Sequence, residues 1–130
     1  MPTVQRFRKL ITAARAAQKN AHAPYSKFKV GAALLTKSGK VYTGVNVENA
    51  SYGLTNCAER VAVGKAISEG HRQFQAIAVV APSVALRPCG ACRQVLAEFG
   101  DCVVICADSR NLRRVRIHLL SELLPHTFTL

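Results

Sequence analysis

Two short cysteine motifs, far apart along the chain, constrain this sequence more than any other feature. One motif is Cys57-Ala58-Glu59 and the other is Pro88-Cys89-Gly90-Ala91-Cys92. Each stands where a predicted helix begins, and thiolates are favoured there by the positive end of the helix dipole and by unpaired backbone N–H groups. If the three thiols bind one metal ion, the fold must bring two helix starts together.

Three cysteine ligands suit zinc and leave one coordination position open. Structural zinc sites normally have four protein ligands, whereas catalytic sites have three and keep a position for water. Cys57, Cys89 and Cys92 therefore predict a catalytic zinc site with one ion per chain. Because three thiolates outweigh the charge of Zn²⁺, we expect at least one nearby guanidinium, that of Arg60 or of Arg93, to donate to a ligand sulfur.

Glu59 is the candidate catalytic residue. It follows Cys57 by two positions, close to the open coordination position but directed away from the ligand face. A carboxylate beside an activated water can take a proton from it and deliver that proton to a substrate. We therefore expect Glu59 to shuttle protons rather than to be a fourth ligand. An isolated glutamate at a helix start would more simply complement the helix dipole.

Length and composition favour one enzyme domain inside the cell. The chain has 130 residues, and we expect residues 1–130 to form a single catalytic domain. No apolar run approaches the ~18 residues that a membrane helix needs, and the N-terminus lacks the pattern of a secretory signal. We therefore expect a cytoplasmic protein without membrane association. Five cysteines in a reducing compartment favour metal binding or catalysis over disulfides.

The net charge of +11 raises the question of nucleic-acid binding. The basic residues are scattered apart from one dense cluster, which comprises Arg110, Arg113, Arg114 and Arg116. No basic run is interleaved with aromatic residues that could stack on bases. We therefore expect a solvated surface and no nucleic-acid partner.

The apolar periodicity predicts helices and strands that alternate after an initial hairpin. Helices are expected over residues 4–20, 57–70, 89–99 and 121–124, and strands over residues 29–35, 41–45, 76–81, 103–107 and 113–118. Thr55 and Asn56 are expected to cap the second helix. This order predicts an α/β fold, a three-layer α-β-α sandwich with a mixed sheet of about five strands. Such sheets place ligands at strand-to-helix junctions, where both cysteine motifs stand.

These motifs together resemble the zinc-dependent cytidine deaminases, in particular the small homotetrameric type. The resemblance extends over residues 24–34, residues 44–52, both cysteine motifs and residues 123–125. It implies a cytidine deaminase-like fold and a hydrolase of pyrimidine salvage. The implied reaction converts cytidine and 2′-deoxycytidine to uridine and 2′-deoxyuridine plus ammonia, by zinc-bound hydroxide with a glutamate proton shuttle. It also implies a homotetramer with shared active sites.

The resemblance further implies which residues contact the nucleoside. Asn46 and Glu48 match a pair that hydrogen-bonds the ribose 3′-hydroxyl. Phe28 matches an aromatic residue that packs on the pyrimidine, and Ala58 matches a residue whose backbone N–H binds the base.

Other positions match residues that complete the pocket of a neighbouring subunit. Ala50 and Tyr52 match contacts to the ribose end, and Phe128 matches an aromatic residue of the C-terminal tail. The chain departs from many relatives at Arg87, where a small residue usually precedes the Pro-Cys pair, and in the short loop of residues 82–86.

Three other functions fit parts of the pattern. A deaminase of nucleic acid, or of another aminopyrimidine such as a nucleoside antibiotic, would use the same zinc site, although the carboxylate of Glu48 would repel a 3′-phosphate. A redox dithiol in the second cysteine motif would leave the first motif without a role. A structural zinc site would need Cys102 or Cys106 as a fourth ligand. We expect these two thiols instead to be buried on one face of a strand.

Overall fold

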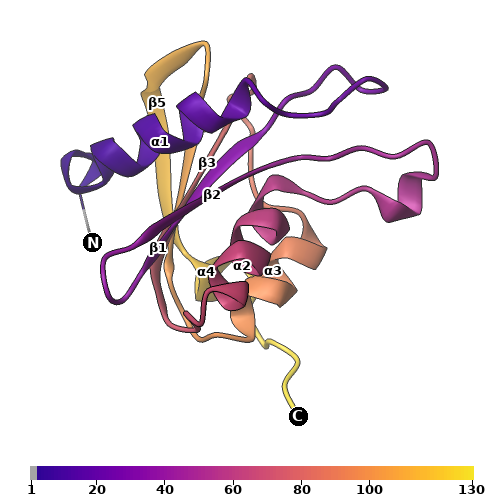
Figure 1. Cartoon of the computed structure of the whole chain (residues 1–130). Coiled ribbons are helices and arrows are strands. Elements are labelled where there is room, and N and C mark those ends of the chain that lie inside the picture. Colours follow the sequence, from indigo (N-terminus) through magenta and orange to yellow (C-terminus); the bar gives the residue numbers. More distant parts are fainter. Residues whose placement is uncertain (1–2) are drawn as a thin grey trace.

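A mixed β-sheet forms the centre of the molecule (Figure 1). A computed structural model describes residues 3–130, and within them the sheet has five strands in the order β2-β1-β3-β4-β5. The strands are β1 (Gly31–Thr36), β2 (Val41–Val45), β3 (Phe74–Ala81), β4 (Val103–Asp108) and β5 (Asn111–Leu119). β3 and β4 are parallel, and the other neighbours are antiparallel. The predicted mixed sheet is confirmed.

Helices cover both faces of this sheet, which confirms the three layers. One face carries α1 (Arg8–Gln18), which follows the 3₁₀ turn η1 (Val4–Phe7). The other face carries α2 (Ala58–Ser68), α3 (Gly90–Ala97) and the short α4 (Leu120–Leu123). A second 3₁₀ turn, η2 (Tyr52–Leu54), lies in the long connection between β2 and α2. Within the described residues, every helix is too short or too polar to cross a lipid bilayer.

Alternate residues of the central strands pack against opposite helical layers. On β3, Ala76, Ala78 and Val80 contribute to the cluster that contains the apolar face of α1, whereas Ile77 and Val79 contribute to the cluster under α2 and α3. Because successive side chains of a strand point to opposite faces, a strand covered on both faces must be apolar throughout. This explains the continuous apolar run that predicted β3.

Two cysteines outside the motifs are core residues, as expected. Cys102 and Cys106 are 6% and 4% exposed and belong to the cluster under α2 and α3. Burial raises the pKa of both thiols to about 12, so they remain neutral near pH 7.

Two glycines let helices approach the sheet closely. A Cβ on Gly31 would lie 2.1 Å from the carbonyl oxygen of Ala14 in α1, and one on Gly44 would lie 2.3 Å from the carbonyl oxygen of Ala58 in α2. Both distances are far below a normal van der Waals contact. Since Ala58 is the first residue of α2, Gly44 sets how closely the start of this helix lies on β2.

The start of α2 differs from the expectation. Its N-cap is Cys57, and neither Thr55 nor Asn56 caps it. The hydroxyl of Thr55 accepts a hydrogen bond from the backbone N–H of Asn49 (3.2 Å), and the backbone of Asn56 pairs with that of Val47. These bonds hold the preceding loop, so the cysteine itself takes the capping position.

Candidate functional site

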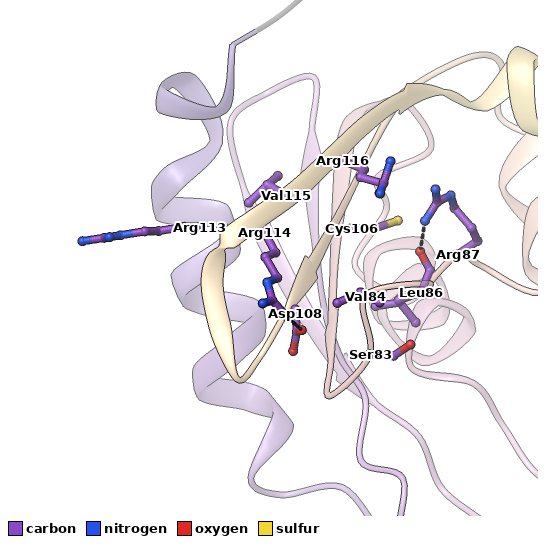
Figure 2. A pocket seen from close by; sticks show the side chains of 10 residues that line it. All are labelled: Ser83, Val84, Leu86, Arg87, Cys106, Asp108, Arg113, Arg114, Val115 and Arg116. Carbon is purple, nitrogen blue, oxygen red and sulfur yellow. Dashed lines mark hydrogen bonds and ion pairs between the residues drawn. The ribbon is translucent and has the colours of Figure 1, made fainter.

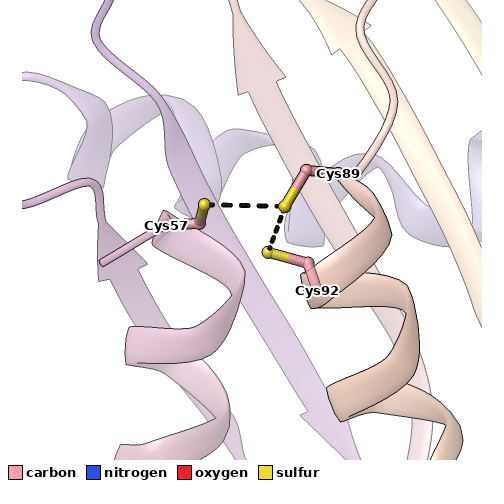
Figure 3. Close-up of side chains that lie close together, drawn as sticks. All are labelled: Cys57, Cys89 and Cys92. Atoms are coloured by element: carbon pink, nitrogen blue, oxygen red, sulfur yellow. Dashed lines mark hydrogen bonds between the residues drawn. The ribbon is translucent and has the colours of Figure 1, made fainter. Parts of the chain in front are cut away.

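The starts of α2 and α3 lie side by side and bring three thiols together (Figure 3). Cys57 and Cys89 are the N-cap residues of the two helices, and Cys92 lies in the first turn of α3. The Sγ atoms of Cys57 and Cys89 are 3.8 Å apart, those of Cys89 and Cys92 are 3.5 Å apart, and all three lie within 4.8 Å of one another. Ligands 2.3 Å from zinc in a tetrahedron are about 3.8 Å from each other. The cluster therefore fits a zinc ion.

The cluster has three ligands and no fourth. Among residues 3–130, no further His, Cys, Asp or Glu side chain joins this group. Cys102 and Cys106 lie elsewhere in the core, so the structural zinc site that would have used one of them is not formed. A three-ligand site keeps one position for water, as catalytic zinc requires.

The surroundings of the cluster favour thiolates. Nη2 of Arg60 donates a hydrogen bond to Sγ of Cys57 over 3.3 Å. Without a metal, hydrogen bonds from the thiol of Cys92 and from Arg60 lower the pKa of Cys57 to about 5. The pKa of Cys92 is raised, because its thiol donates to Cys57 and is largely buried. The thiol of Cys57 is therefore ionised at neutral pH, whereas the thiol of Cys92 keeps its proton and donates it in a hydrogen bond to Cys57.

Arg93 does not donate to a ligand sulfur, although its position in the sequence allowed it. Its Nε donates to the carbonyl oxygen of Pro88 (2.7 Å), and its Nη1 donates to the carbonyl oxygen of Leu123 (2.8 Å). The guanidinium thus ties the segment before Cys89 to the end of α4. Backbone carbonyls compete for its donors, and these carbonyls come from parts of the chain that helix spacing alone does not place.

Glu59 is buried beside the cluster. It is 5% exposed, in the first turn of α2. Burial raises the pKa of its carboxyl to about 7, and the negative charge of Cys57 adds to this rise. A carboxyl with this pKa exists in both protonation states near neutral pH, which suits a group that takes up and releases protons.

The chain also matches known proteins. Residues 5–108 match the family described as the cytidine and deoxycytidylate deaminase zinc-binding region. This chain belongs to that family. The deaminase is therefore a zinc-binding enzyme and a hydrolase, and its three-cysteine cluster is the site that fits the metal.

Relatives of the deaminase are similar over most of their length. The cytidine deaminase of Halalkalibacterium halodurans is 52% identical in an alignment over 124 residues, with 92% of each chain covered. The probable cytidine deaminase of Dictyostelium discoideum is 51% identical in an alignment over 129 residues, with 96% of this chain and 85% of that protein covered. The crystal structure of cytidine deaminase from Burkholderia pseudomallei has a TM-score of 0.88 and 51% identity, covering 93% of this chain and 98% of that chain.

A second polar centre of the deaminase surrounds Glu48. Its Oε1 accepts hydrogen bonds from the backbone N–H groups of Tyr25 (3.0 Å) and Ser26 (3.1 Å), and its Oε2 accepts one from the hydroxyl of Ser26. These bonds, chiefly that from the Ser26 hydroxyl, lower the pKa of Glu48 and keep it ionised. The same residues, with Tyr52 and Thr55, line a cavity of about 370 Å³.

Ser26 is a residue of this polar centre that was not among the predicted site residues. Its hydroxyl donates to Glu48 and accepts a hydrogen bond from the backbone N–H of Phe28 (3.0 Å). It therefore links two residues that the family resemblance placed at the substrate. Ser26 stands inside the motif that carried the resemblance, but a serine in a loop has no spacing that points to a particular partner.

Asn46 supports the backbone near Phe28. It is 8% exposed. Its Oδ1 accepts from the backbone N–H of Val30 (2.9 Å), and its Nδ2 donates to the carbonyl oxygen of Phe28 (2.8 Å). The side chain thus holds the segment that enters β1, and one amide hydrogen remains for another acceptor. Phe28 is 38% exposed.

The remaining predicted contact residues lie on the surface of the chain. Ala50 is exposed, and Tyr52 and Phe128 are 74% and 70% exposed. The ring of Tyr52 meets that of Tyr25 edge-on, with 5.9 Å between the centroids. The C-terminal tail leaves the body of the molecule in Figure 1, and Gln94 donates to the carbonyl oxygen of Phe128 over 3.1 Å.

Proposed function

We propose that this protein hydrolyses cytidine and 2′-deoxycytidine to uridine and 2′-deoxyuridine plus ammonia, with residues 1–130 as one catalytic domain. The observation that carries the proposal is the position of Glu59, a buried carboxyl with a pKa of about 7 beside three thiols that fit zinc. The relatives named above as cytidine deaminases support the choice of nucleoside.

In this proposal Cys57, Cys89 and Cys92 hold one zinc ion per chain. Zinc at such a site supplies Lewis acidity, which activates water at neutral pH for attack on an electrophilic carbon. Arg60 draws negative charge away from the sulfur of Cys57 through its hydrogen bond of 3.3 Å. Its Nε is buried without a hydrogen-bond partner among residues 3–130, so this second N–H of the guanidinium is available to donate another hydrogen bond at the site.

Glu59 moves the protons of the reaction. Its ionised form accepts a proton from water, and its neutral form donates that proton to N3 of the pyrimidine. It then takes the proton of the hydroxyl group added at C4 and gives it to the exocyclic amine, so that the C4 carbonyl forms as the C–N bond breaks and ammonia leaves. Because burial holds the pKa near neutrality, both directions of transfer have a small energetic cost at the working pH.

The nucleoside is held at two ends. We assign Glu48 and Asn46 to the ribose 3′-hydroxyl, Phe28 to the face of the pyrimidine, and the backbone N–H of Ala58 to the base. The carboxylate of Glu48 is kept ionised and oriented by Ser26, so it can accept a hydrogen bond from a free 3′-hydroxyl. The same charge disfavours a polynucleotide, which carries a phosphate at this position.

We further propose a homotetramer with shared active sites, acting in pyrimidine salvage in the cytoplasm. Ala50, Tyr52 and Phe128 would each complete the pocket of a neighbouring subunit. Their exposure in the single chain supports this, because large aromatic side chains gain stability when a partner covers them.

A zinc determination combined with an ammonia-release assay on cytidine tests the proposed reaction. Glu59→Gln should retain one zinc per chain and the fold but lose nearly all turnover, because an amide cannot transfer the proton. Glu69→Gln, at the exposed end of the same helix, is the matched control and should keep wild-type turnover. Wild-type turnover in Glu59→Gln would remove Glu59 from the mechanism.

The substrate class is tested by comparing cytidine, cytidine monophosphate, a nucleoside antibiotic with an aminopyrimidine, and a single-stranded oligonucleotide. We expect the highest kcat/KM for cytidine. A preference for the antibiotic or the oligonucleotide would refute the proposed substrate while leaving the zinc chemistry in place.

A further inference from the structure

A second large cavity of the chain is strongly basic and is lined by none of the zinc-cluster residues (Figure 2). It has a volume of about 420 Å³ and lies between the loop that precedes α3 and the strands β4 and β5. The loop contributes Ser83, Leu86 and Arg87, and β5 contributes Arg114 and Arg116. The proposed reaction uses none of these side chains.

Three arginines line this cavity from two elements, and the guanidinium of one of them, Arg114, is directed toward Asp108. Arg114 and Arg116 are two positions apart on β5, so they stand on the same face of the strand, and Arg87 reaches the cavity from the loop. Figure 2 shows Arg87 and Arg116 close to the sulfur of Cys106, whereas Arg113, which also lines the cavity, extends its guanidinium away from it. The arginine cluster in the sequence is therefore divided by the strand, and only part of it faces inward.

A carboxylate, that of Asp108, balances only part of the positive charge of the cavity. Asp108 accepts hydrogen bonds from Nε and Nη2 of Arg110 (3.0 Å each), and its Oδ2 lies 3.7 Å from Nη1 of Arg114. Among residues 3–130, no carboxylate oxygen lies within 4.0 Å of the guanidinium of Arg87 or Arg116. Arg87 donates one hydrogen bond, to the carbonyl oxygen of the residue before it (2.7 Å). Most donors of these two side chains are thus free.

The positive charge of these arginines also affects the pKa of a nearby histidine, His118. Burial, followed by the positive charges of Arg87 and Arg116, lowers the pKa of His118 on β5. Nε2 of His118 is buried and has no hydrogen-bond partner among residues 3–130. The region therefore combines unpaired cations with a polar atom that lacks a partner.

We propose that this cavity binds a phosphate-bearing small molecule, whose phosphate group lies between Arg87 and Arg116. Guanidinium groups match the geometry of phosphate and form paired, charge-assisted hydrogen bonds with it. The volume falls in the range of small-ligand sites, so the cavity accommodates inorganic phosphate or the phosphate end of a nucleotide. The proposal does not depend on the reaction at the cysteine cluster.

Calorimetric titration of the full-length, zinc-loaded protein at constant ionic strength tests this site. One titration uses inorganic phosphate, a second uses ATP without magnesium, and a third uses adenosine as the uncharged control. We expect saturable binding of at least one phosphate compound at one site per chain, and none of adenosine. Arg116→Gln should weaken that binding about tenfold or more, because it removes charged hydrogen bonds.

Arg113→Gln is the matched control, since it removes the same charge from the same strand but from a side chain that points away from the cavity. We expect its affinity to stay within about twofold of wild type. Tighter binding of phosphate than of ATP would identify the free ion as the ligand, and the reverse order would identify a phosphorylated compound. Both results support the site.

Several results would overturn the proposal. One is the absence of saturable binding for both phosphate compounds. Another is an equal loss of affinity in Arg113→Gln and Arg116→Gln, because it would show a diffuse basic surface. In a fourth titration, with a single-stranded oligonucleotide, tight binding of that ligand alone would show the same. A change of oligomeric state in Arg116→Gln alone, measured by light scattering, would show instead that the cavity is a contact between subunits.

Discussion

Nη2 of Arg60 lies 3.3 Å from Sγ of Cys57, one helical turn away on α2. Arg93 follows Cys89 in the sequence by a similar spacing of about one helical turn, but its guanidinium donates to the carbonyl oxygens of Pro88 and Leu123. One arginine therefore acts on the charge of a ligand, and the other holds backbone in place.

This difference gives the first prediction. In Arg60→Gln, kcat on cytidine should fall about 10- to 100-fold with zinc still bound, because the thiolate donates more charge to the metal when the cation is absent. Steady-state kinetics and a zinc determination on the same sample measure this. In Arg93→Gln the main loss should be in thermal stability. Unchanged kcat in zinc-loaded Arg60→Gln would show that the hydrogen bond has no part in catalysis.

The contact between Gly44 and Ala58 gives the second prediction. A methyl group on Gly44 would lie 2.3 Å from the carbonyl oxygen of Ala58, so Gly44→Ala must move the start of α2 away from β2. We expect a loss of about 1–3 kcal/mol in the free energy of unfolding, together with reduced zinc binding, because Cys57 moves with the helix.

Gly64→Ala is the control for this prediction. Gly64 lies on α2 and has no atom within 4 Å of an added Cβ, so alanine should stabilise the helix by about 0.5–1 kcal/mol. Chemical denaturation of both variants measures the two changes. Equal stability of the two variants would contradict the close approach at Gly44.

Ser26 gives the third prediction, since its hydroxyl orients the carboxylate of Glu48. In Ser26→Ala, kcat/KM for cytidine should fall about tenfold, mainly through KM, because the carboxylate is no longer held toward the ribose. With 3′-deoxycytidine, which lacks the hydroxyl that Glu48 is proposed to bind, the same substitution should have little effect. Equal losses on both substrates would mean that Ser26 acts only through the structure of the loop.

Asp108 gives a prediction about pH. Hydrogen bonds from Arg110, and the charges of Arg110 and Arg114, lower the pKa of this carboxyl in the folded protein. The ionised form thus stabilises the fold above the unfolded-state pKa of about 3.9, and this stabilisation is lost as the pH falls through the lower folded-state value. Asp108→Asn should therefore melt at a lower temperature than wild type at pH 7, with a smaller difference below about pH 4.

The control for this pH dependence is Glu98→Gln. Glu98 is exposed and has no ion pair within the described residues, so its melting temperature should follow that of wild type at each pH. A constant difference between Asp108→Asn and wild type from pH 7 to pH 3 would contradict the lowered pKa.

The amino-acid sequence alone determined the chemistry and the layers of this protein. The residue types in the two cysteine motifs predicted zinc, and the three Sγ atoms do lie together. The apolar periodicity predicted the helices and strands, because burial on one or two faces leaves a repeat in the sequence. The roles of the individual substrate contacts and of Glu59 stay predictions, which the variants above test.

Only the tertiary structure decided which hydrogen-bond partner each polar side chain has. Arg60 and Arg93 have similar spacing from a ligand, yet only Arg60 reaches sulfur, and Ser26 lies against Glu48 from a different loop. The strand β5 also directs its arginines differently, since the guanidinium of Arg113 extends away from the cavity that Arg116 faces. The physical reason is that hydrogen bonds and ion pairs act over a few ångströms between segments far apart in the chain, and packing of the sheet and helices sets those distances.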